Sequence, residues 1–476
     1  MRLMYVATPV LAALLATAVA SGASQENRHK RWVKEYTGTE TCLKCHEEEA
    51  EAFFHSQHYQ WRGETPAMVN SDGQKLGKLT MINDFCTNPG GAQWIGKVTN
   101  DDGKVLAKGC STCHAGLGLL PAETPSRVQL ENIDCLICHA NGYRRDLYAT
   151  EDGEWEWRPI LWKNQEGMNS VARRITVPTR TMCLRCHSAS GGGPNYKRGD
   201  IEYTLKEPDR SFDVHMAANG KDMWCVDCHA GDAHRVKGRG VDLAATDSPG
   251  HDLSCSGSCH GETPHDVPAL DNHTERVYCT TCHIPVFAKD EPTDMRRDWS
   301  TITWSEEKGK YTYDVTLEQN VEPVYAWYNG SSYNQIPGQP VRRNTDGAVT
   351  MVTPDGDRAD PAARIYAFKL HRGVLPVLKG KDWIMPVATE ELYHHGDPDR
   401  AVRDAAKSFY GLDQVDYEWT DTVRYMGLFH EIPPAEDALQ CLDCHSPDGR
   451  MDWQALGYDG DPLATRRTAA SKDSGR

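Results

Sequence analysis

CLRCH, residues 183–187, is one of seven Cys-x-x-Cys-His pentapeptides in this 476-residue chain. Two thiols at this spacing lie about one helical turn apart, so they can form thioether bonds to the two vinyl groups of one haem, and the next histidine then binds the iron as the proximal ligand. Cys-x-x-Cys pairs also build zinc sites, but zinc does not require a histidine after every pair. The repeat therefore predicts covalently attached haem c. The seven copies are Cys42/Cys45/His46, Cys110/Cys113/His114, Cys135/Cys138/His139, Cys183/Cys186/His187, Cys225/Cys228/His229, Cys279/Cys282/His283 and Cys441/Cys444/His445.

An eighth site, Cys255-Ser-Gly-Ser-Cys259-His260, has one residue more between its thiols. Gly257 would let that residue bulge without strain, so we expect a covalent haem here as well. Attachment through one cysteine, or a structural thiol pair, is the alternative. We number the motifs one to eight in chain order, which makes this site motif six. Eight haems then use sixteen of the 17 cysteines and leave Cys86 unassigned.

The composition indicates that something besides side chains fills the interior. Hydrophobic residues make up 39% of the chain and the mean hydropathy is -0.62, which is a thin apolar content for this length. We therefore expect a mainly α fold with extensive loops, whose core is a packed array of eight covalent haems, with a few short strands in the 300–330 region. The net charge of -16 argues against nucleic acid as a partner, and it favours a basic redox protein or a quinol-linked electron donor.

The N-terminus predicts export to the periplasm. Arg2 is followed by an apolar run that ends in the small-residue site Ala18-Val19-Ala20, the layout of a cleaved signal peptide at 1–20. An uncleaved anchor is the alternative, but the run is short and contains Pro9. No later segment looks able to cross a membrane, so we do not expect an integral membrane protein.

The spacing of the motifs divides the rest of the chain. Motifs one to seven lie within 21–299, which we interpret as the haem domain. The cysteine-free segment 300–440 shows strand-like alternation and is expected to pack on the haem array. Residues 441–476 hold motif eight and a tail that we expect to be disordered.

Twelve histidines lie outside the attachment motifs, and low-spin electron-transfer haems need a second nitrogen ligand, which neutral imidazole supplies. His29 is set aside because it lies in the expected processed region, and His394 and His395 because they look like a loop. A structural role is the alternative for any one histidine. We expect seven distal ligands: His58, His215, His234, His251, His265, His273 and His430.

Several runs outside the attachment pentapeptides are distinctive. They are INDFC at 82–86, CHSASGGGPNYKRGD at 186–200, DVHM at 213–216, TPHD and NHT around His265 and His273, and CHIPVFAKDEPTDMRRDWS at 282–300. In these runs the chain resembles the octahaem tetrathionate reductase family of periplasmic multihaem cytochromes, over nearly all of its haem-bearing length. The widened motif six departs from the family pattern, which has two residues between the cysteines.

The resemblance implies a catalytic haem at motif two with Lys197 as its distal ligand. An amine must lose its proton to bind iron, and burial beside a cationic metal allows this. The resemblance also places the lone Cys86, preceded by Asn83, beside that haem, where its thiolate would be a nucleophile towards a sulfane sulfur. A buried inert thiol is the alternative for Cys86.

The expected function is therefore that of a periplasmic oxidoreductase. Seven bis-histidine haems would relay electrons to the lysine-ligated haem, which reduces a small sulfur or nitrogen oxyanion: tetrathionate, and also nitrite or hydroxylamine. One alternative is an electron-transfer conduit without chemistry of its own. Another is a hydroxylamine-oxidising octahaem enzyme, although no tyrosine in the sequence stands out for the haem cross-link that such enzymes use.

Overall fold

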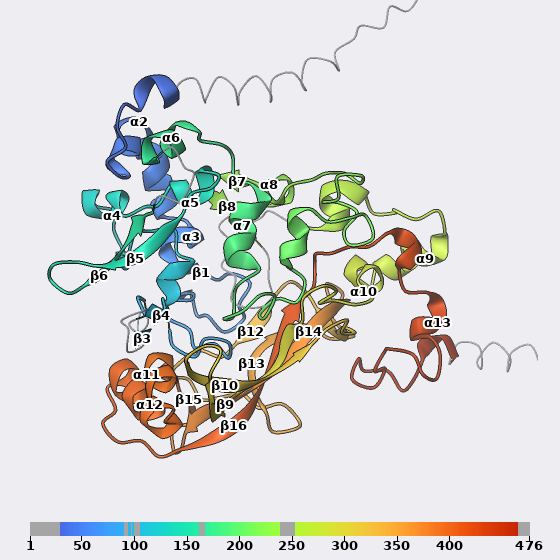
Figure 1. Cartoon of the computed structure of the whole chain (residues 1–476). Helices are drawn as coiled ribbons and strands as arrows, with labels where there is room; N and C mark the ends of the chain where they lie inside the picture. The colour runs from blue at the N-terminus through green and yellow to red at the C-terminus, as the bar shows by residue number, and fades with distance from the viewer. Residues whose placement is uncertain are drawn as a thin grey trace, which may run out of the picture.

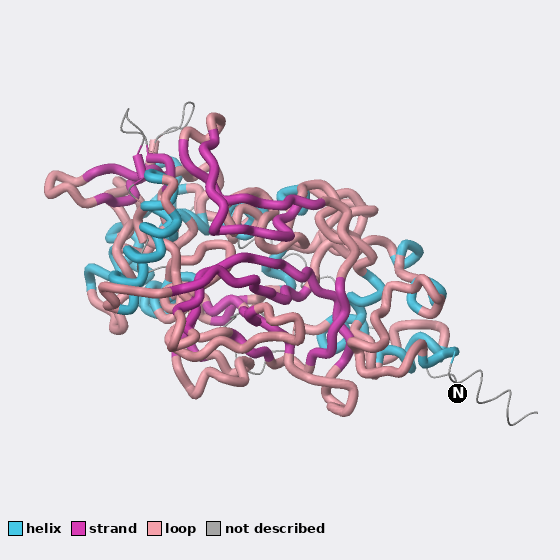
Figure 2. The backbone as a smooth tube through the Cα atoms, turned by 90° about the horizontal axis from the view of Figure 1, so that it is seen from below, coloured by secondary structure: helices cyan, strands magenta, loops and turns pink. Residues whose placement is uncertain are grey.

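The computed structural model describes residues 29–89, 94–96, 98–99, 105–160, 167–238 and 253–464. The expected signal segment, His251 and the tail from residue 465 onward lie outside these ranges. Figure 1 shows two parts: short helices that run in an arc from α2 to α13, and a sheet that lies along one side of this arc. The two ends of the arc lie at opposite ends of the molecule in Figure 1, and the perpendicular view of Figure 2 shows long strands in the middle of the molecule with helices on either side.

Every attachment motif lies on a short helix or a single helical turn. This follows from the chemistry, because the two thiols of a motif must project from the same side one turn apart. The elements are α2 (Glu40–Phe54), η1 (Cys110–Thr112), α5 (Leu136–His139), α7 (Arg180–His187), α8 (Cys225–Cys228), η3 (Ser256–His260), α10 (Cys279–His283) and α13 (Cys441–Cys444).

Motif six forms a π-helical turn, η3, with Cys255 at its N-terminal end. A π-turn closes i to i+5 and so takes up one residue more than an α-turn. The extra residue between Cys255 and Cys259 is accommodated in this way, and the backbone of Gly261 closes the turn by donating to the Ser256 carbonyl at 3.1 Å.

The largest element is an eight-stranded sheet in the order β10-β9-β14-β16-β13-β12, with β11 and β15 also paired to β14. Most neighbours are antiparallel, but β14 runs parallel to β9 and β13 runs parallel to β16. The strands are β9 (Thr293–Ser305), β10 (Lys310–Glu318), β11 (Val324–Tyr328), β12 (Ser332–Asn334), β13 (Val349–Pro354), β14 (Arg364–Leu378), β15 (Trp383–Ile384) and β16 (Tyr417–Gly427).

This sheet corrects the prediction of a mainly α fold with a few short strands at 300–330. The central strand β14 was missed because it is buried along nearly its whole length, so its sequence RIYAFKLHRGVLPVL lacks the alternation that marks a half-exposed strand. Within this apolar run Lys369 and His371 are fully buried.

One end of the sheet is covered by α11 (Thr389–His395) and α12 (Pro398–Ala405), which pack against β10 and β9 respectively. Asp397 caps α12 by accepting from the Arg400 backbone N–H at 3.1 Å. Leu392 and Val402 belong to the core under these helices, together with Trp299 of β9 and Leu375 of β14. This side of the sheet is a conventional apolar core.

The remaining elements are small. No helix among the described residues is long and apolar enough to span a membrane. Four two-stranded ribbons are formed by β1 (Gly63–Glu64) with β2 (Lys75–Leu76), β3 (Val98–Thr99) with β4 (Val105–Ala107), β5 (Arg145–Ala149) with β6 (Trp155–Pro159), and β7 (Gly231–Asp232) with β8 (Arg235–Val236). The other helices are α3 (Gln57–Gln60), α4 (Arg127–Glu131), α6 (Met168–Arg173), η2 (Tyr203–Lys206), α9 (Pro268–Thr274), η4 (Ala406–Tyr410) and η5 (Ala435–Asp437).

Candidate haem-binding and catalytic site

Seven of the eight motif histidines face a second histidine ring. The ring centroids of all seven pairs are 6.0 to 6.3 Å apart. The pairs are His46 with His29, His187 with His58, His139 with His234, His260 with His215, His229 with His430, His283 with His265, and His445 with His273.

This spacing fits one iron between two imidazoles. An imidazole nitrogen binds a transition metal at about 2 Å, so two rings on opposite sides of one metal have centroids roughly 6 Å apart. Rings that stack directly are much closer: the centroids of His394 and His395 are 4.4 Å apart. The seven pairs therefore have the separation of axial ligand pairs.

Hydrogen bonds orient these rings. In six of them Nδ1 lies 2.7 to 3.1 Å from an oxygen, which leaves Nε2 for the metal. Three of the acceptors are backbone carbonyls: Thr176 for His139, Lys237 for His229 and Ala269 for His273. The other three are carboxylates: Asp271 for His265, Asp200 for His430 and Asp461 for His445.

Burial keeps several of these rings in the neutral form that a metal requires. It lowers the pKa of His187 to about 3, with smaller contributions from His58 and Lys78. It also lowers the pKa of His58, His139 and His229. A neutral imidazole has a lone pair to offer to iron.

The structure brings together six of the seven expected distal histidines with motif histidines, and the seventh partner is His29. His251 lies outside the described residues, whereas His29, set aside in the sequence because of its position near the N-terminus, lies 6.1 Å from His46 in a stacked arrangement. His29 lies seventeen residues before His46, and this spacing does not indicate in the sequence that the two rings face each other. His55, His371, His394 and His395 form none of the 6 Å pairs.

Cysteines of different motifs lie beside one another and give the order of the haems in space. Four pairs are in direct contact: Cys42 with Cys135, Cys113 with Cys186, Cys183 with Cys225, and Cys255 with Cys279. Others are within electrostatic reach: Cys138 with Cys183 and Cys186, Cys228 with Cys259, and Cys282 with Cys441 and Cys444. Haems one, three, four, five, six, seven and eight thus follow one another, and haem two joins at haem four.

Four motif thiols, Cys45 among them, have exposed side chains. Cys45 lies on α2 one turn after Cys42, and its side chain is exposed, whereas Cys42 is partly buried and contacts Cys135. The reason is position, because α2 stands at one end of the arc (Figure 1). The motif spacing still assigns Cys45 to haem one, so one edge of that haem is expected at the surface. The other motif thiols with exposed side chains are Cys228, Cys259 and Cys441.

His114 of motif two is arranged differently. Its ring is fully buried among Tyr59, Trp61 and Trp94, with centroid distances of 5.0, 5.7 and 4.5 Å. Within the described ranges, no second histidine ring faces it. Nε2 lies 2.7 Å from the Tyr59 carbonyl, and Nδ1 is buried without a hydrogen-bond partner. Burial lowers the pKa of His114 to about 3, so the ring is neutral, with one nitrogen held and one left for a metal.

Cys86 lies close to motif two. Its side chain is exposed and within electrostatic reach of Cys110, the first cysteine of that motif. Asn83 Oδ1 accepts from the Phe85 backbone N–H at 2.9 Å, which is an Asx turn that shapes the loop immediately before Cys86. In this structure the Asn83 side chain therefore supports the loop.

Lys197 ends the glycine-rich loop that follows motif four. The loop is closed by backbone bonds from Asn195 to Ser188 at 2.6 Å and from Lys197 to Ser190 at 3.1 Å. Gly191 has a φ of 91°, and a Cβ there would lie 3.0 Å from the Cβ and N atoms of Lys197. Glycine is required at 191 on both grounds, and the backbone of the loop is held firmly.

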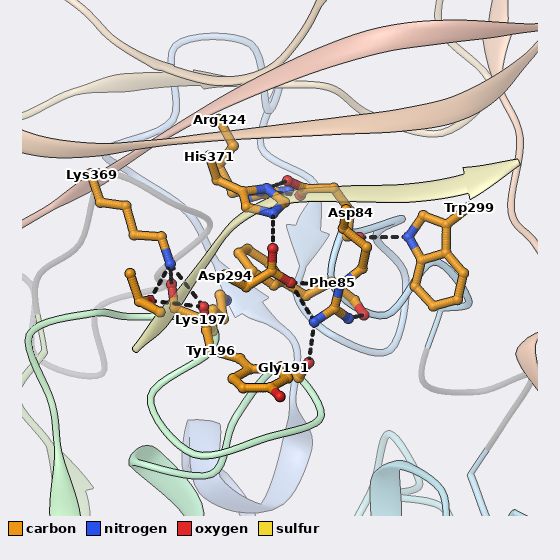
Figure 3. Close-up of polar contacts among 12 residues, drawn as sticks. Asp84, Phe85, Gly191, Tyr196, Lys197, Asp294, Trp299, Lys369, His371 and Arg424 are labelled. Carbon is orange, nitrogen blue, oxygen red and sulfur yellow. Dashed lines mark hydrogen bonds and ion pairs between the residues drawn. The ribbon is translucent and has the colours of Figure 1, made fainter. Parts of the chain in front are cut away.

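A buried cluster of charged residues joins the Cys86 loop to the Lys197 loop (Figure 3). Its members come from the loop at 82–86 and from β9, β14 and β16, and each is at most 4% exposed. They are Asp84, Asp294, Arg297, Lys369, His371 and Arg424. One signal of this cluster was overlooked in the sequence, which is the pair of charged side chains inside the otherwise apolar β14.

Arg297 and Lys369 hold the backbones of the two loops. Arg297 donates to the Phe85 carbonyl and, at 2.7 Å, to the Gly191 carbonyl. Lys369 Nζ lies 2.8 Å from the Tyr196 carbonyl, 3.1 Å from the Lys197 carbonyl and 2.6 Å from Thr293 Oγ1. Three acceptors match the three N–H groups of an ammonium. Burial lowers the pKa of Lys369 to about 7, although Asp294 opposes the shift.

Eight attachment motifs and seven facing histidine pairs define a multihaem c-type cytochrome. Comparisons with known proteins agree. A family model described as "Cytochrome c bacterial" matches residues 285–448, which contain the sheet and motif eight. An uncharacterised protein of Archaeoglobus fulgidus is 32% identical over 296 residues, a match that covers 52% of this chain and 96% of that protein. The crystal structure of an octahaem cytochrome c from Shewanella oneidensis is similar with a TM-score of 0.72 at 30% identity, over 92% of this chain and 98% of that one.

The chain therefore belongs to the octahaem cytochromes c and carries eight covalently bound haems c, as the sequence predicted. The haems supply one-electron transfer, and the chain supplies their ligands, order and surroundings.

Proposed function

We propose that this protein is an exported octahaem reductase, whose catalytic haem is attached at motif two and has Lys197 as its distal ligand. The observation that carries the proposal is the exception at His114: seven motif histidines face a histidine at 6.0 to 6.3 Å, and among the described residues His114 does not. Bis-histidine coordination leaves no position for a substrate, so the exceptional haem is the one where a substrate can bind.

The distal ligand set that we propose is His29, His58, His215, His234, His265, His273 and His430, together with Lys197. His29 takes the place of His251 because its ring lies opposite His46. Lys197 binds as a neutral amine, and its four-carbon stem allows the amine to leave the iron and donate a proton while the loop backbone stays in place. The order of the motifs delivers electrons to haem two through haem four, because Cys186 contacts Cys113.

The substrate class is a small sulfur or nitrogen oxyanion. Two electrons split the central S–S bond of tetrathionate into two thiosulfates, and the Cys86 thiolate is suited to attack or hold a sulfane sulfur. Nitrite or hydroxylamine bound at an iron has no evident need for that thiol. Export across the cytoplasmic membrane and a basic redox protein or quinol-linked donor as electron source are parts of the same proposal.

The first test uses the distal lysine. Lys197→Ala should change the electron paramagnetic resonance signal of one haem in eight, and Lys197→His should make that haem bis-histidine and abolish reduction of all three substrates. Lys221→Ala, which removes an exposed lysine, is the control. An unchanged spectrum in both Lys197 variants would remove Lys197 from the iron.

The second test distinguishes the substrates. Cys86→Ala should suppress tetrathionate reduction, assayed with a reduced viologen dye, much more than nitrite or hydroxylamine reduction. Equal losses on all three substrates would assign Cys86 a structural role, and no loss would place it outside the site.

An electron conduit is the second candidate, and it is favoured by the line of neighbouring cysteines from motif one to motif eight, some in direct contact and others within electrostatic reach. Such a line of haems connects opposite ends of the molecule, from α2 to α13 (Figure 1). A conduit needs no open coordination site. Binding of carbon monoxide or nitrite to one reduced haem supports the reductase, and the failure of both to bind supports the conduit.

A further inference from the structure

Among the described residues, His371 is the one histidine that contacts both carboxylates of the buried cluster. Its Nδ1 lies 2.5 Å from Asp84 Oδ2 and its Nε2 lies 3.2 Å from Asp294 Oδ1. Two carboxylates accept and do not donate, so both ring nitrogens must carry hydrogen and the ring is an imidazolium. Its face stacks on Phe85 with a centroid distance of 4.0 Å. His371 therefore bridges the Cys86 loop and β9.

The sheet is shaped to receive the loop at this point. His371 and Gly373 lie on the same side of β14, and a Cβ on Gly373 would be 2.8 Å from Thr422 Oγ1 and 3.4 Å from the Asp84 Cβ. Glycine thus leaves room for the Thr422 hydroxyl and lets the backbone of β14 lie close to Asp84. The pairing of β9 with β10 shifts by one residue at Met295, and this bulge lets Asp294 and Arg297 face the cluster together.

Both carboxylates of the cluster contact basic side chains. Arg424 and His371 both contact the Asp84 carboxylate, and Arg297 contacts Asp294 at 2.6 Å. Burial alone would raise the pKa of Asp84, yet Arg424 and His371 hold it well below its usual range. Replacing such a cluster by packed apolar side chains is often neutral or stabilising. The stability of the fold therefore does not explain why the cluster is present.

That reason is the position of the two loops. Asp84 is two residues before Cys86, and Asp294 belongs to the same ion pair as Arg297, which holds Gly191 in the Lys197 loop. A chain of direct contacts therefore runs from the Cys86 loop through Asp84, His371, Asp294 and Arg297 to the Lys197 loop (Figure 3).

We propose that His371 is a positioning residue: as a buried imidazolium between Asp84 and Asp294, it sets the placement of the Cys86 thiol relative to Lys197 at the catalytic haem. This inference rests on the proposed function for the roles of Cys86 and Lys197, and on the contacts above for the placement itself. Neither ring nitrogen of His371 is left over for substrate, so it acts through the loops.

The holoprotein offers a readout that does not depend on turnover. Sixteen of its cysteines are thioethers, so Cys86 is the only free thiol, and its rate of alkylation by iodoacetamide reports the setting of its loop. His371→Leu removes both contacts, and His371→Gln can keep only the donor towards Asp294. Both variants should retain eight haems by pyridine haemochrome assay. His371→Leu should change the alkylation rate of Cys86 by about tenfold, and His371→Gln should change it less.

Gly373→Ala tests the same idea without changing any charge. The added methyl would lie 2.8 Å from Thr422 Oγ1, so Thr422 must move beside Asp84. The variant should therefore alter the alkylation rate in the same direction as His371→Leu, and both should shift the resonance signal of one haem. His394→Ala, in an exposed histidine of α11, is the matched control and should change neither quantity.

An alkylation rate and a haem spectrum that stay at their wild-type values in His371→Leu and Gly373→Ala would overturn the proposal. If His371→Leu fails to incorporate haem, Gly373→Ala and His371→Gln decide by the same two measurements. A wild-type protein that reduces no sulfur or nitrogen oxyanion, while the alkylation and spectral changes occur as expected, would refute the proposed function and leave the positioning role intact.

Discussion

The seven histidine pairs and the surroundings of motif two differ in how the two sides of a haem site are held in place. In each pair, two rings stand about 6 Å apart, and six of the fourteen rings are oriented by one hydrogen bond at Nδ1. Once iron binds both nitrogens, the metal itself holds the two sides together. Around motif two, the proposed reductase needs one side that can open, so there the metal would not hold both sides together. In that proposal the two loops are positioned by six buried ionisable side chains, five of them on the sheet and one, Asp84, in the Cys86 loop.

The sharpest way to break this contrast is to remove a cation from the cluster. Arg297→Gln leaves the buried Asp294 with His371 as its remaining cationic contact, and breaking a buried ion pair costs about 3–5 kcal/mol in the free energy of unfolding. Guanidinium unfolding followed by far-ultraviolet circular dichroism measures this loss. Arg403→Gln, which breaks the exposed pair with Asp399, should leave the midpoint unchanged. Equal effects of the two substitutions would contradict the structural importance of the cluster.

Loss of one histidine of a pair should change a single haem, whereas loss of a charge in the cluster should lower the stability of the whole protein. His29→Ala removes the ring that faces His46, so one haem in eight should change from low spin to high spin, while the other seven keep their signals. Electron paramagnetic resonance of the oxidised protein shows the change. His251→Ala is the informative comparison, since a spin change in that variant and none in His29→Ala would return the role to His251.

The stability of the protein at low pH tests the contribution of Asp84 to the cluster. The pKa of Asp84 is held below its ordinary value of 3.8, so its ionised form stabilises the fold above that pH, and this contribution is lost as pH falls from about 4 towards the lower folded-state pKa. In Asp84→Asn the stability between pH 4 and pH 2 should depend less on pH than in the wild type. Unfolding midpoints measured across this range test it, and curves of equal slope would exclude Asp84 as a source of acid sensitivity.

The smallest expected effect concerns haem eight. Asp461 accepts from His445 Nδ1 at 2.7 Å, and the carboxylate charge stabilises ferric iron through the ring. Asp461→Asn should raise the midpoint potential of one haem by about 60 mV, which is a tenfold change in a one-electron equilibrium. Spectroelectrochemical titration resolves the shift, and Asp459→Asn, an exposed acid on the same segment, is the control. If both variants shift the midpoint potential by the same amount, the cause is the change in net surface charge and not the hydrogen bond to His445.

Sequence reasoning succeeded where the chemistry is local. The thiol pairs and their adjacent histidines predicted eight haems, which the comparisons confirm, while the roles that the family resemblance implies for Cys86 and Lys197 stay predictions. Spacing could not give the partner of each motif histidine, because His187 meets His58 through tertiary folding alone. The extent of the sheet was not predicted because β14 is buried on both faces. The buried cluster was not predicted because its members are far apart in the chain.

One of these pairings has a consequence for the order in which the protein is made. His430 stands three residues beyond the end of β16, at Gly427, so the whole segment of the sheet separates it in the chain from its partner His229. During synthesis from the N-terminus, haem five can be attached to Cys225 and Cys228 long before His430, its proposed second axial ligand, has emerged. Completion of that coordination waits until the sheet has folded and carried His430 back, which makes the ligation of haem five a late event in maturation and a marker that the sheet is in place.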